Sequence, residues 1–247
     1  MTKAIFPSFE FEESLWSSGY DVVAGADEVG RGSFAGPVVA AAVAFRKFSD
    51  YQFPIINEDK QKVVIRDSKT LSERQRIIAG EWIKGHSIFS NVGLASVIEI
   101  NENGISAACF SAFRRAVGGM NIGTGNSVQF LLVDGYIIPE IGINNSSKQE
   151  LVGAENAINH SSDQLAIKKG DQRSFSISAA SIIAKLFRDD LMKKLGREKQ
   201  HKVYGWASNK GYGTQQHTIA ILKHGMTDHH RTQFVETFLK KHKREDI

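Results

Sequence analysis

The stretch "VAGADEVGRGSFAGPVV", residues 23–39, decides the fold of this chain. It begins as an apolar run typical of a buried strand, and this run ends in two acidic residues, Asp27 and Glu28. Two glycines on either side of an arginine follow, and a second apolar run comes next. The pattern predicts two strands, at 21–27 and 37–45, joined by a glycine-rich connection.

The rest of the chain alternates strand-like runs with apolar residues at helical spacing. Further strands are predicted at 87–96, 128–135 and 163–171, and helices are predicted at 71–84, 105–117 and 176–196. In the helix at 71–84, Ser72 is the expected N-cap and Gln75 completes a capping box. This mixture predicts an α/β fold with a mixed sheet flanked by helices.

The predicted elements indicate one main domain at 21–196. Residues 1–20 show no clear period and are expected to form an N-terminal lead-in. Residues 197–247 are expected to form a mostly helical extension that packs on the same domain. The polar, turn-rich stretch at 142–163 is typical of an inserted surface loop.

Composition limits the partners and the setting of the protein. A net charge of +4 over 247 residues permits an anionic partner without requiring one. The single cysteine, Cys109, excludes an intramolecular disulfide and suits a reducing compartment. The N-terminus lacks a signal-peptide pattern, and no apolar stretch reaches the roughly 20 residues of a spanning helix. We therefore expect a cytoplasmic protein without a membrane partner.

Acidic residues stand at the ends of three strand-like runs. Asp27 and Glu28 end the first run, Asp134 precedes Gly135, and Asp171 follows Gly170. The ends of such strands converge in open α/β sheets. Carboxylates placed together remain ionised only when cations compensate their repulsion, and oxygen ligands favour Mg²⁺ or Mn²⁺. Two such ions can activate water and stabilise the leaving oxygen of a phosphodiester.

Each acidic residue also has a simpler interpretation, as a solvated strand end or a turn residue. Neighbouring residues of a strand face opposite sides of the sheet. Asp27 and Glu28 can therefore share a site only if the strand stops at this point and the chain turns.

The turn at Gly30-Arg31-Gly32 suits the recognition of a sugar or a phosphate. Glycine allows close approach of another group to the backbone, and the arginine offers a positive fork suited to phosphate. Exposed backbone N–H and C=O groups are suitable readers of a ribose 2′-hydroxyl, which is both a donor and an acceptor. The alternative interpretation is a flexible surface turn.

The order of these pieces resembles the type 2 ribonucleases H, specifically the bacterial ribonuclease HII group. The matching stretches are "AGADEVGRGSFAGPVVAAAV" (24–43), "RDSKTLS" (66–72), "LLVDG" (131–135), "KKGDQRSFSISAASIIAKLFRDDLM" (168–192), "YGWASNKGYGTQQH" (204–217) and, more weakly, "HHRTQF" (229–234). They occur in the order of the family and span most of the chain.

The resemblance implies a ribonuclease H-like fold and a divalent-metal-dependent endoribonuclease. Such an enzyme hydrolyses the phosphodiester on the 5′ side of a ribonucleotide, either in an RNA–DNA hybrid or embedded in duplex DNA. Its products carry a 3′-hydroxyl and a 5′-phosphate. The resemblance implies that Asp27, Glu28, Asp134 and Asp171 are the catalytic residues and hold Mg²⁺ or Mn²⁺ in a two-metal site.

The resemblance also implies a set of substrate-binding residues. It makes Gly30-Arg31-Gly32 the reader of the 2′-hydroxyl and directs Lys69 towards phosphate. It places Tyr212 near the sugar that follows the ribonucleotide, where an aromatic ring can stack. Nothing in the sequence suggests an obligate oligomer, so we expect a monomer.

Two departures from the family leave alternatives open. The stretch between Asp134 and Asp171 looks longer than in bacterial members, which leaves Asp189 as a rival fourth acid. Lys185, Arg188 and Asp189 share a helix face and are expected to form a supporting network, with a phosphate contact as an option.

The second departure is at the C-terminal "GMTDHHRTQF", residues 225–234, which leaves a contact role for Arg231 in doubt. His229 and His230 lack spaced zinc-ligand partners and are expected at the surface or facing the duplex. Two other functions remain as alternatives: another two-metal nuclease of the same fold, and a non-catalytic binder of hybrid duplexes.

Overall fold

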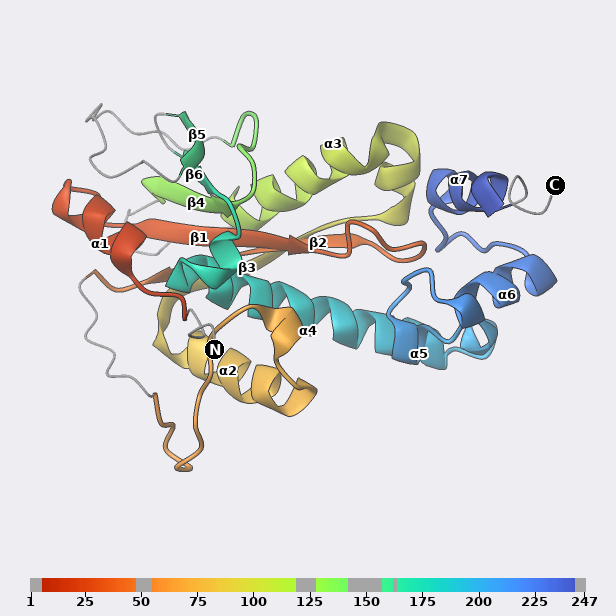
Figure 1. Cartoon of the computed structure of the whole chain (residues 1–247), viewed down its shortest axis with the longest axis horizontal. Helices are drawn as coiled ribbons and strands as arrows, with labels where there is room; N and C mark the ends of the chain where they lie inside the picture. The colour runs from red at the N-terminus through yellow and green to blue at the C-terminus, as the bar shows by residue number, and fades with distance from the viewer. Residues whose placement is uncertain (1–5, 48–54, 119–127, 142–156, 162–163, 243–247) are drawn as a thin grey trace.

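A computed structural model describes residues 6–47, 55–118, 128–141, 157–161 and 164–242. Six strands form one mixed sheet in the order β3-β2-β1-β4-β6-β5 (Figure 1). The strands are β1 (Val23–Val29), β2 (Val38–Phe45), β3 (Ser87–Ala95), β4 (Phe130–Asp134), β5 (Ala157–Ser161) and β6 (Gln164–Ile167). The predicted mixed α/β sheet is therefore confirmed.

The central strand β1 is antiparallel to β2 and parallel to β4. Strand β4 is in turn parallel to β6. Because parallel strands end at the same edge of a sheet, β1, β4 and β6 deliver their C-terminal residues to one edge.

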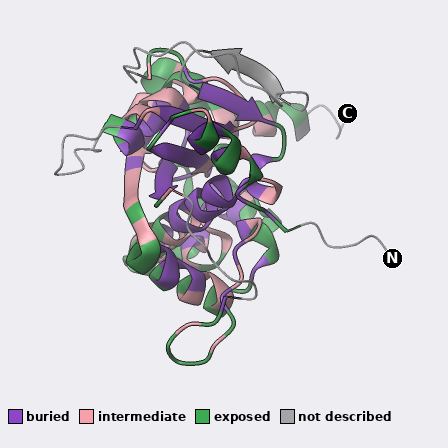
Figure 2. Cartoon of the chain, turned by 90° about the vertical axis from the view of Figure 1, so that its left-hand side faces the viewer, coloured by how far each residue is buried: buried purple, intermediate pink, exposed green. Residues whose placement is uncertain are grey.

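Helices cover both faces of the sheet. Helices α2 (Glu73–His86) and α4 (Phe175–Arg197) pack on one face, and α3 (Val97–Gly118) packs on the other (Figure 1). Alternate residues of β2 divide between the two cores: Val39, Ala41 and Val43 face α2 and α4, whereas their neighbours face α3. Strands β2, β4 and β6 and the first ten residues of α4 are accordingly almost entirely buried (Figure 2).

Two helices show how local sequence sets their ends. The predicted capping box of α2 is present, with Ser72 and Gln75 bonded reciprocally. Helix α3 begins at Val97, eight residues before the predicted start at 105. Gly104 interrupts it with a φ of 79°. The sequence pattern predicts only the part of the helix that follows Gly104.

The lead-in at 1–20 contains a buried helix, α1 (Glu10–Ser17). Its Leu15 and Trp16 belong to the core beneath α4. The buried carboxylate of Glu12 accepts hydrogen bonds from the hydroxyls of Ser174 and Ser176, at the start of α4. This N-terminal segment therefore braces the main fold.

The C-terminal part contains α5 (Trp206–Asn209), α6 (Gln215–His224) and α7 (Thr232–His242). These helices lie at the far end of α4 (Figure 1), around a small core that includes Met192 of α4. Of the predicted loop at 142–163, residues 157–161 form β5, and the rest lies outside the described residues. Within the described ranges, no helix is long and apolar enough to cross a membrane.

Candidate active site

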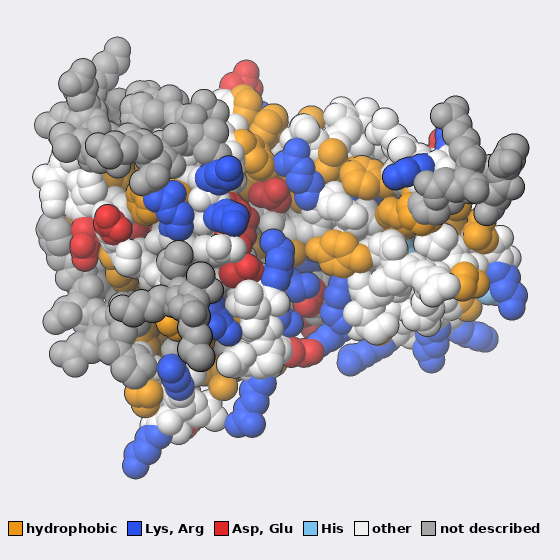
Figure 3. Space-filling view, in the orientation of Figure 1, with side chains coloured by type: hydrophobic (Ala, Val, Ile, Leu, Met, Phe, Trp, Pro, Cys, Tyr) orange, Lys and Arg blue, Asp and Glu red, His pale blue; other side chains and the backbone are white. Residues whose placement is uncertain are grey.

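Three acidic side chains converge where the parallel strands end. Asp27 lies in β1, Asp134 is the last residue of β4, and Asp171 lies in the short 3-10 helix η3 (Gly170–Gln172) after β6. One carboxylate oxygen of each lies within 4.8 Å of the other two. Figure 3 shows acidic side chains near the middle of one face with Lys and Arg side chains around them.

Hydrogen bonds hold these carboxylates in place. The Gly170 N–H donates to Oδ1 of Asp134 at 2.7 Å. The hydroxyl of Ser181 on α4 is hydrogen-bonded to Asp27, and it also lies 2.9 Å from the hydroxyl of Ser68. The stretch "DSK" therefore supports Asp27 through α4.

Too little positive charge lies near the three carboxylates to stabilise all of them in the ionised form. Burial, and then the charges of Glu28 and Asp134, raise the pKa of Asp27 well above its usual range. Burial also raises the pKa of Asp134. The pKa of Asp171 rises to about 6, because of burial and then the charge of Asp134. Converging carboxylate oxygens whose ionised forms are disfavoured fit a divalent cation, which would reverse these shifts.

Lys69, at the start of the chain segment before α2, faces this cluster. Burial opposes its charge, but the carboxylates of Asp27 and Asp171 outweigh burial and raise the pKa of the amine. Its backbone N–H donates to Oδ1 of Asp67 at 3.0 Å, which orders the turn. Lys69 therefore supplies part of the missing positive charge.

Glu28 does not join the three acids. We expected β1 to stop at Asp27, but the strand continues, with Glu28 opposite Ala40 and Val29 opposite Val39. Glu28 therefore faces the α3 side of the sheet, whereas Asp27 faces α4. The pKa of Glu28 is raised by burial and, among the charges, by Asp134, so these two carboxylates still interact across the strand end.

Arg31 lies on the same side as Glu28. Its guanidinium is 3.7 Å from the Glu28 carboxylate and 5.1 Å from the centre of the Tyr136 ring. The Arg31 side chain is 44% exposed, so it remains accessible to an anion.

Glycine suits the two positions of the turn for different physical reasons. Gly30 has a φ of 88°, and a Cβ there would lie 2.1 Å from Nε of Arg188. A Cβ at Gly32 would meet no atom within 4 Å. Only Gly32 therefore presents its bare backbone to open space, and Gly30 makes room for an internal side chain.

Arg188 is fully buried and joins two loops. It donates to the carbonyls of Pro37 and Ala35, at 2.9 and 3.1 Å, and to the carbonyl of Lys210 at 2.9 Å. Its exposed fraction is 0%, so the phosphate contact that we considered for it is wrong. The sequence around Arg188 gave no signal of this role, because the acceptors are backbone carbonyls.

Arg231 supports the same turn from within the fold. Its guanidinium donates to the carbonyls of Gly36 and Arg31, both at 2.9 Å. Because Arg231 is also fully buried, it holds the Gly30-Arg31-Gly32 turn in place and is not exposed to a ligand.

Tyr212 lies beside this turn. The Gly211 carbonyl accepts hydrogen bonds from the N–H groups of Phe34 and Ala35, at 2.8 and 3.1 Å. The ring centre of Tyr212 is 5.5 Å from the guanidinium of Arg188. The C-terminal extension thus brings Tyr212 to the loop between β1 and β2, although the two are far apart in sequence.

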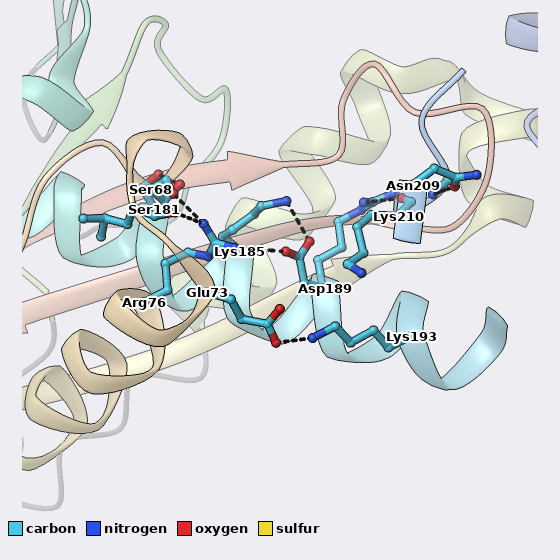
Figure 4. A network of polar contacts seen from close by, with 12 residues as sticks. Ser68, Glu73, Arg76, Ser181, Lys185, Asp189, Lys193, Asn209 and Lys210 are labelled. Atoms are coloured by element: carbon cyan, nitrogen blue, oxygen red, sulfur yellow. Dashed lines mark hydrogen bonds and ion pairs between the residues drawn. The ribbon is translucent and has the colours of Figure 1, made fainter. Parts of the chain in front are cut away.

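Asp189, the rival fourth acid, lies in a separate network. Figure 4 shows it between Lys185, at 2.7 Å, and Arg76, at 3.9 Å. Arg76 in turn donates to the carbonyl of Ser68 at 3.1 Å. The expected support by Lys185 and Asp189 is present. Asp171, and not Asp189, belongs to the acidic cluster.

Comparison with known proteins identifies the family around this site. The family model described as "Ribonuclease HII" matches residues 24–237. A curated "Ribonuclease HII" of Salinibacter ruber is 41% identical over 223 residues, which covers 90% of this chain and 96% of that protein. Another, from a Synechococcus species, is 38% identical over 232 residues and covers 94% and 90% of the two chains.

Solved structures share the fold. The chain matches the ribonuclease HII of a PCNA complex from Archaeoglobus fulgidus with a TM-score of 0.58 and 23% identity, covering 85% of this chain and 93% of that one. It matches the ribonuclease H2 of Pyrococcus horikoshii with the same TM-score and identity, covering 89% and 99%. The predicted ribonuclease H-like architecture is therefore confirmed.

Proposed function

Because this chain belongs to the ribonuclease HII family, we propose that it cuts on the 5′ side of a ribonucleotide, either embedded in duplex DNA or in an RNA strand paired with DNA. Membership of the family makes the chain an endoribonuclease that acts on nucleic acid. The products of the proposed cut carry a 3′-hydroxyl and a 5′-phosphate.

The observation that carries the proposed chemistry is the convergence of Asp27, Asp134 and Asp171 within 4.8 Å. These carboxylates would hold Mg²⁺ or Mn²⁺, and Glu28, whose carboxylate interacts with that of Asp134, is proposed as the fourth acid. Bound divalent ions lower the pKa of the attacking water and stabilise charge on the leaving oxygen. The chain's own residues fix where the scissile phosphate lies relative to those ions.

We assign substrate recognition to the two joined loops and to Lys69. The open backbone at Gly32 supports close approach of a ribose 2′-hydroxyl, and the exposed Arg31 supports a phosphate contact. Tyr212 offers its ring to the sugar that follows the ribonucleotide. Lys69, beside the acids, is assigned to the phosphate backbone.

We further propose that residues 21–196 act as the catalytic domain and that 197–247 serve as an extension that completes substrate binding. The contact between the Gly211 carbonyl and Phe34 supports this division of work. We propose a monomer in the cytoplasm, the compartment that suits a chain with one cysteine.

One end-labelled duplex with a single ribonucleotide tests the proposal. It is incubated with Mg²⁺, with Mn²⁺ and with chelator, beside an all-DNA duplex of the same sequence. We expect one metal-dependent cut 5′ to the ribonucleotide and none in the all-DNA control. Equal cutting of both duplexes would indicate a general two-metal nuclease, and binding without any cut would indicate a non-catalytic hybrid binder.

A further inference from the structure

A chain of buried hydrogen bonds leads to the backbone of Tyr212. Nδ1 of His217 lies 3.0 Å from the Tyr212 carbonyl, and Nε2 of His217 lies 3.1 Å from Nε2 of His230. Nδ1 of His230 lies 2.8 Å from the N–H of Thr227. Both histidines are buried, with exposed fractions of 0% and 1%, which corrects the expectation that His230 is at the surface or faces the duplex.

The partners fix the proton on each ring. A backbone N–H can only donate, so Nδ1 of His230 accepts from Thr227 and its proton is on Nε2. That proton is donated to Nε2 of His217, which also accepts from the indole N–H of Trp206 at 3.0 Å. The proton of His217 is therefore on Nδ1, from which it donates to the Tyr212 carbonyl.

The chain requires both rings to be neutral, and the surroundings favour this state. Burial lowers the pKa of His217. Burial, and then the proximity of His217, lower the pKa of His230 to about 4. Both rings therefore remain neutral near pH 7 and keep the order of donors and acceptors.

Tyr212 is tightly held at its backbone and is partly exposed. Its carbonyl also accepts from the Thr214 N–H at 2.8 Å, and its own N–H donates to the Asn209 carbonyl at 3.0 Å. Of these partners, His217 is the one whose side chain ties the turn to the interior of the C-terminal extension. Removing that donor leaves the Tyr212 carbonyl bonded only to the N–H of Thr214, its near neighbour in sequence.

We propose that His217 is a positioning residue for Tyr212, in the tautomer that the two donors at its Nε2, the indole of Trp206 and the ring of His230, fix. The proposal rests on the proposed function, in which the Tyr212 ring stacks on a substrate sugar. His217 does not touch the substrate; it sets the angle at which the ring meets it.

Two substitutions of His217 separate the two ring nitrogens. The amide of Asn lies where Nδ1 lies, so His217→Asn keeps a donor to the Tyr212 carbonyl. The amide of Gln lies where Nε2 lies, so His217→Gln loses that donor. For the single-ribonucleotide duplex we expect kcat/KM to fall about 10-fold or more in His217→Gln and by less than about 3-fold in His217→Asn.

A double-mutant cycle with Tyr212→Ala distinguishes positioning from general support of the fold. Once the ring is absent, His217→Gln is expected to cause no further loss of cleavage. Equal losses in both His217 variants, or losses that multiply with Tyr212→Ala, would overturn the proposal. An unaffected Tyr212→Ala variant would overturn it too, while cleavage by the wild type keeps the proposed function intact.

The melting temperature of each variant shows whether it folds. If His217→Gln does not fold, the same comparison of cleavage rates is made with substitutions of His230, the next ring in the chain of hydrogen bonds. In a Trp206→Phe background, which removes the other donor to Nε2 of His217, His230→Gln keeps the donor to His217 and is expected to cleave as that background does, whereas His230→Asn loses the donor and is expected to cleave more slowly. Equal activity of these two variants would also contradict the proposal.

Discussion

Two charged regions of the molecule flank the turn after β1, and they are built in opposite ways. The acidic cluster brings together Asp27, Asp134 and Asp171, whose ionised forms are disfavoured where they lie. The arginine junction buries Arg188 and Arg231, whose guanidiniums donate to five backbone carbonyls of the adjoining loops.

The availability of partners within the chain separates charges that stabilise the fold from charges that bind a ligand. Neutral carbonyls accept from all three nitrogens of Arg188 and from Nε and Nη1 of Arg231, so the junction draws these partners from within the chain, and among the described residues only Nη2 of Arg231 has none in this pair. The acids repel one another, so the chain alone does not supply the positive charge that would keep all three ionised. Burial alone does not identify a functional charge; the supply of partners does.

The largest expected effect is on the acidic side of this comparison. Asp134→Asn keeps the Oδ1 acceptor for the Gly170 N–H but removes an anionic ligand. We expect cleavage of the single-ribonucleotide duplex to fall by about 1000-fold or more. Circular dichroism and duplex binding are expected to stay close to those of the wild type.

Asp189→Asn is the matched control for that variant, because it removes an acid from the separate network with Lys185. It is expected to retain substantial cleavage. Loss of cleavage in Asp189→Asn together with activity in Asp171→Asn would exchange the roles of these two acids.

On the arginine side, Arg188→Met is expected to weaken the fold. It leaves the carbonyls of Ala35, Pro37 and Lys210 without their donor. We expect the free energy of unfolding, measured by urea denaturation, to fall by about 3 kcal/mol or more. An unchanged midpoint would show that the junction contributes no stability.

The two glycines of the turn divide between these roles: Gly30 makes room for Arg188, and Gly32 leaves space for a ligand. Gly30→Ala strains a φ of 88° and meets Arg188, so we expect it to lower stability by about 2 kcal/mol or more. Gly32→Ala meets nothing within 4 Å, so its stability is expected to change by less than about 0.5 kcal/mol. Its cleavage of the ribonucleotide is nevertheless expected to fall, because the new methyl group occupies the space of the sugar. Melting curves and initial rates of both variants would reveal a reversed pattern.

The smallest effect is a dependence of stability on pH. The pKa of Asp171 is raised from 3.8 to about 6 in the folded state, so its ionisation opposes folding. In chelator, the wild type should lose stability relative to Asp171→Asn as the pH rises through this range. We expect a difference of about 1 to 2 kcal/mol, after allowance for solvent screening. Denaturation of both proteins across this range measures it, and a constant difference would contradict the shift.

The convergence of Asp27, Asp134 and Asp171 could be predicted from sequence, since each follows a strand-like run and parallel strands end together. The direction of Glu28 could not, because it depends on how far β1 pairs with β2, and Ala40 carries no sign of that register. Long-range pairing of this kind decides which face a side chain takes.

The contacts of Arg188 and Arg231 could not be predicted from the sequence for a different reason. The acceptors of Arg188 and Arg231 are backbone carbonyls, which every residue possesses, so no motif marks them. The helix α1 was missed because its stability comes from burying Leu15 and Trp16 against distant segments. A helix as short as this one is marginal by local propensity alone.

A divalent cation is expected to complete the acidic cluster of Asp27, Asp134 and Asp171. The most direct test of this expectation is the melting temperature of the wild type and of Asp134→Asn, each in chelator and in excess Mn²⁺ or Mg²⁺. A cation that binds only the folded protein raises the melting temperature. We predict a rise for the wild type and little or none for Asp134→Asn. An equal rise in both proteins, or no rise in either, would contradict the account.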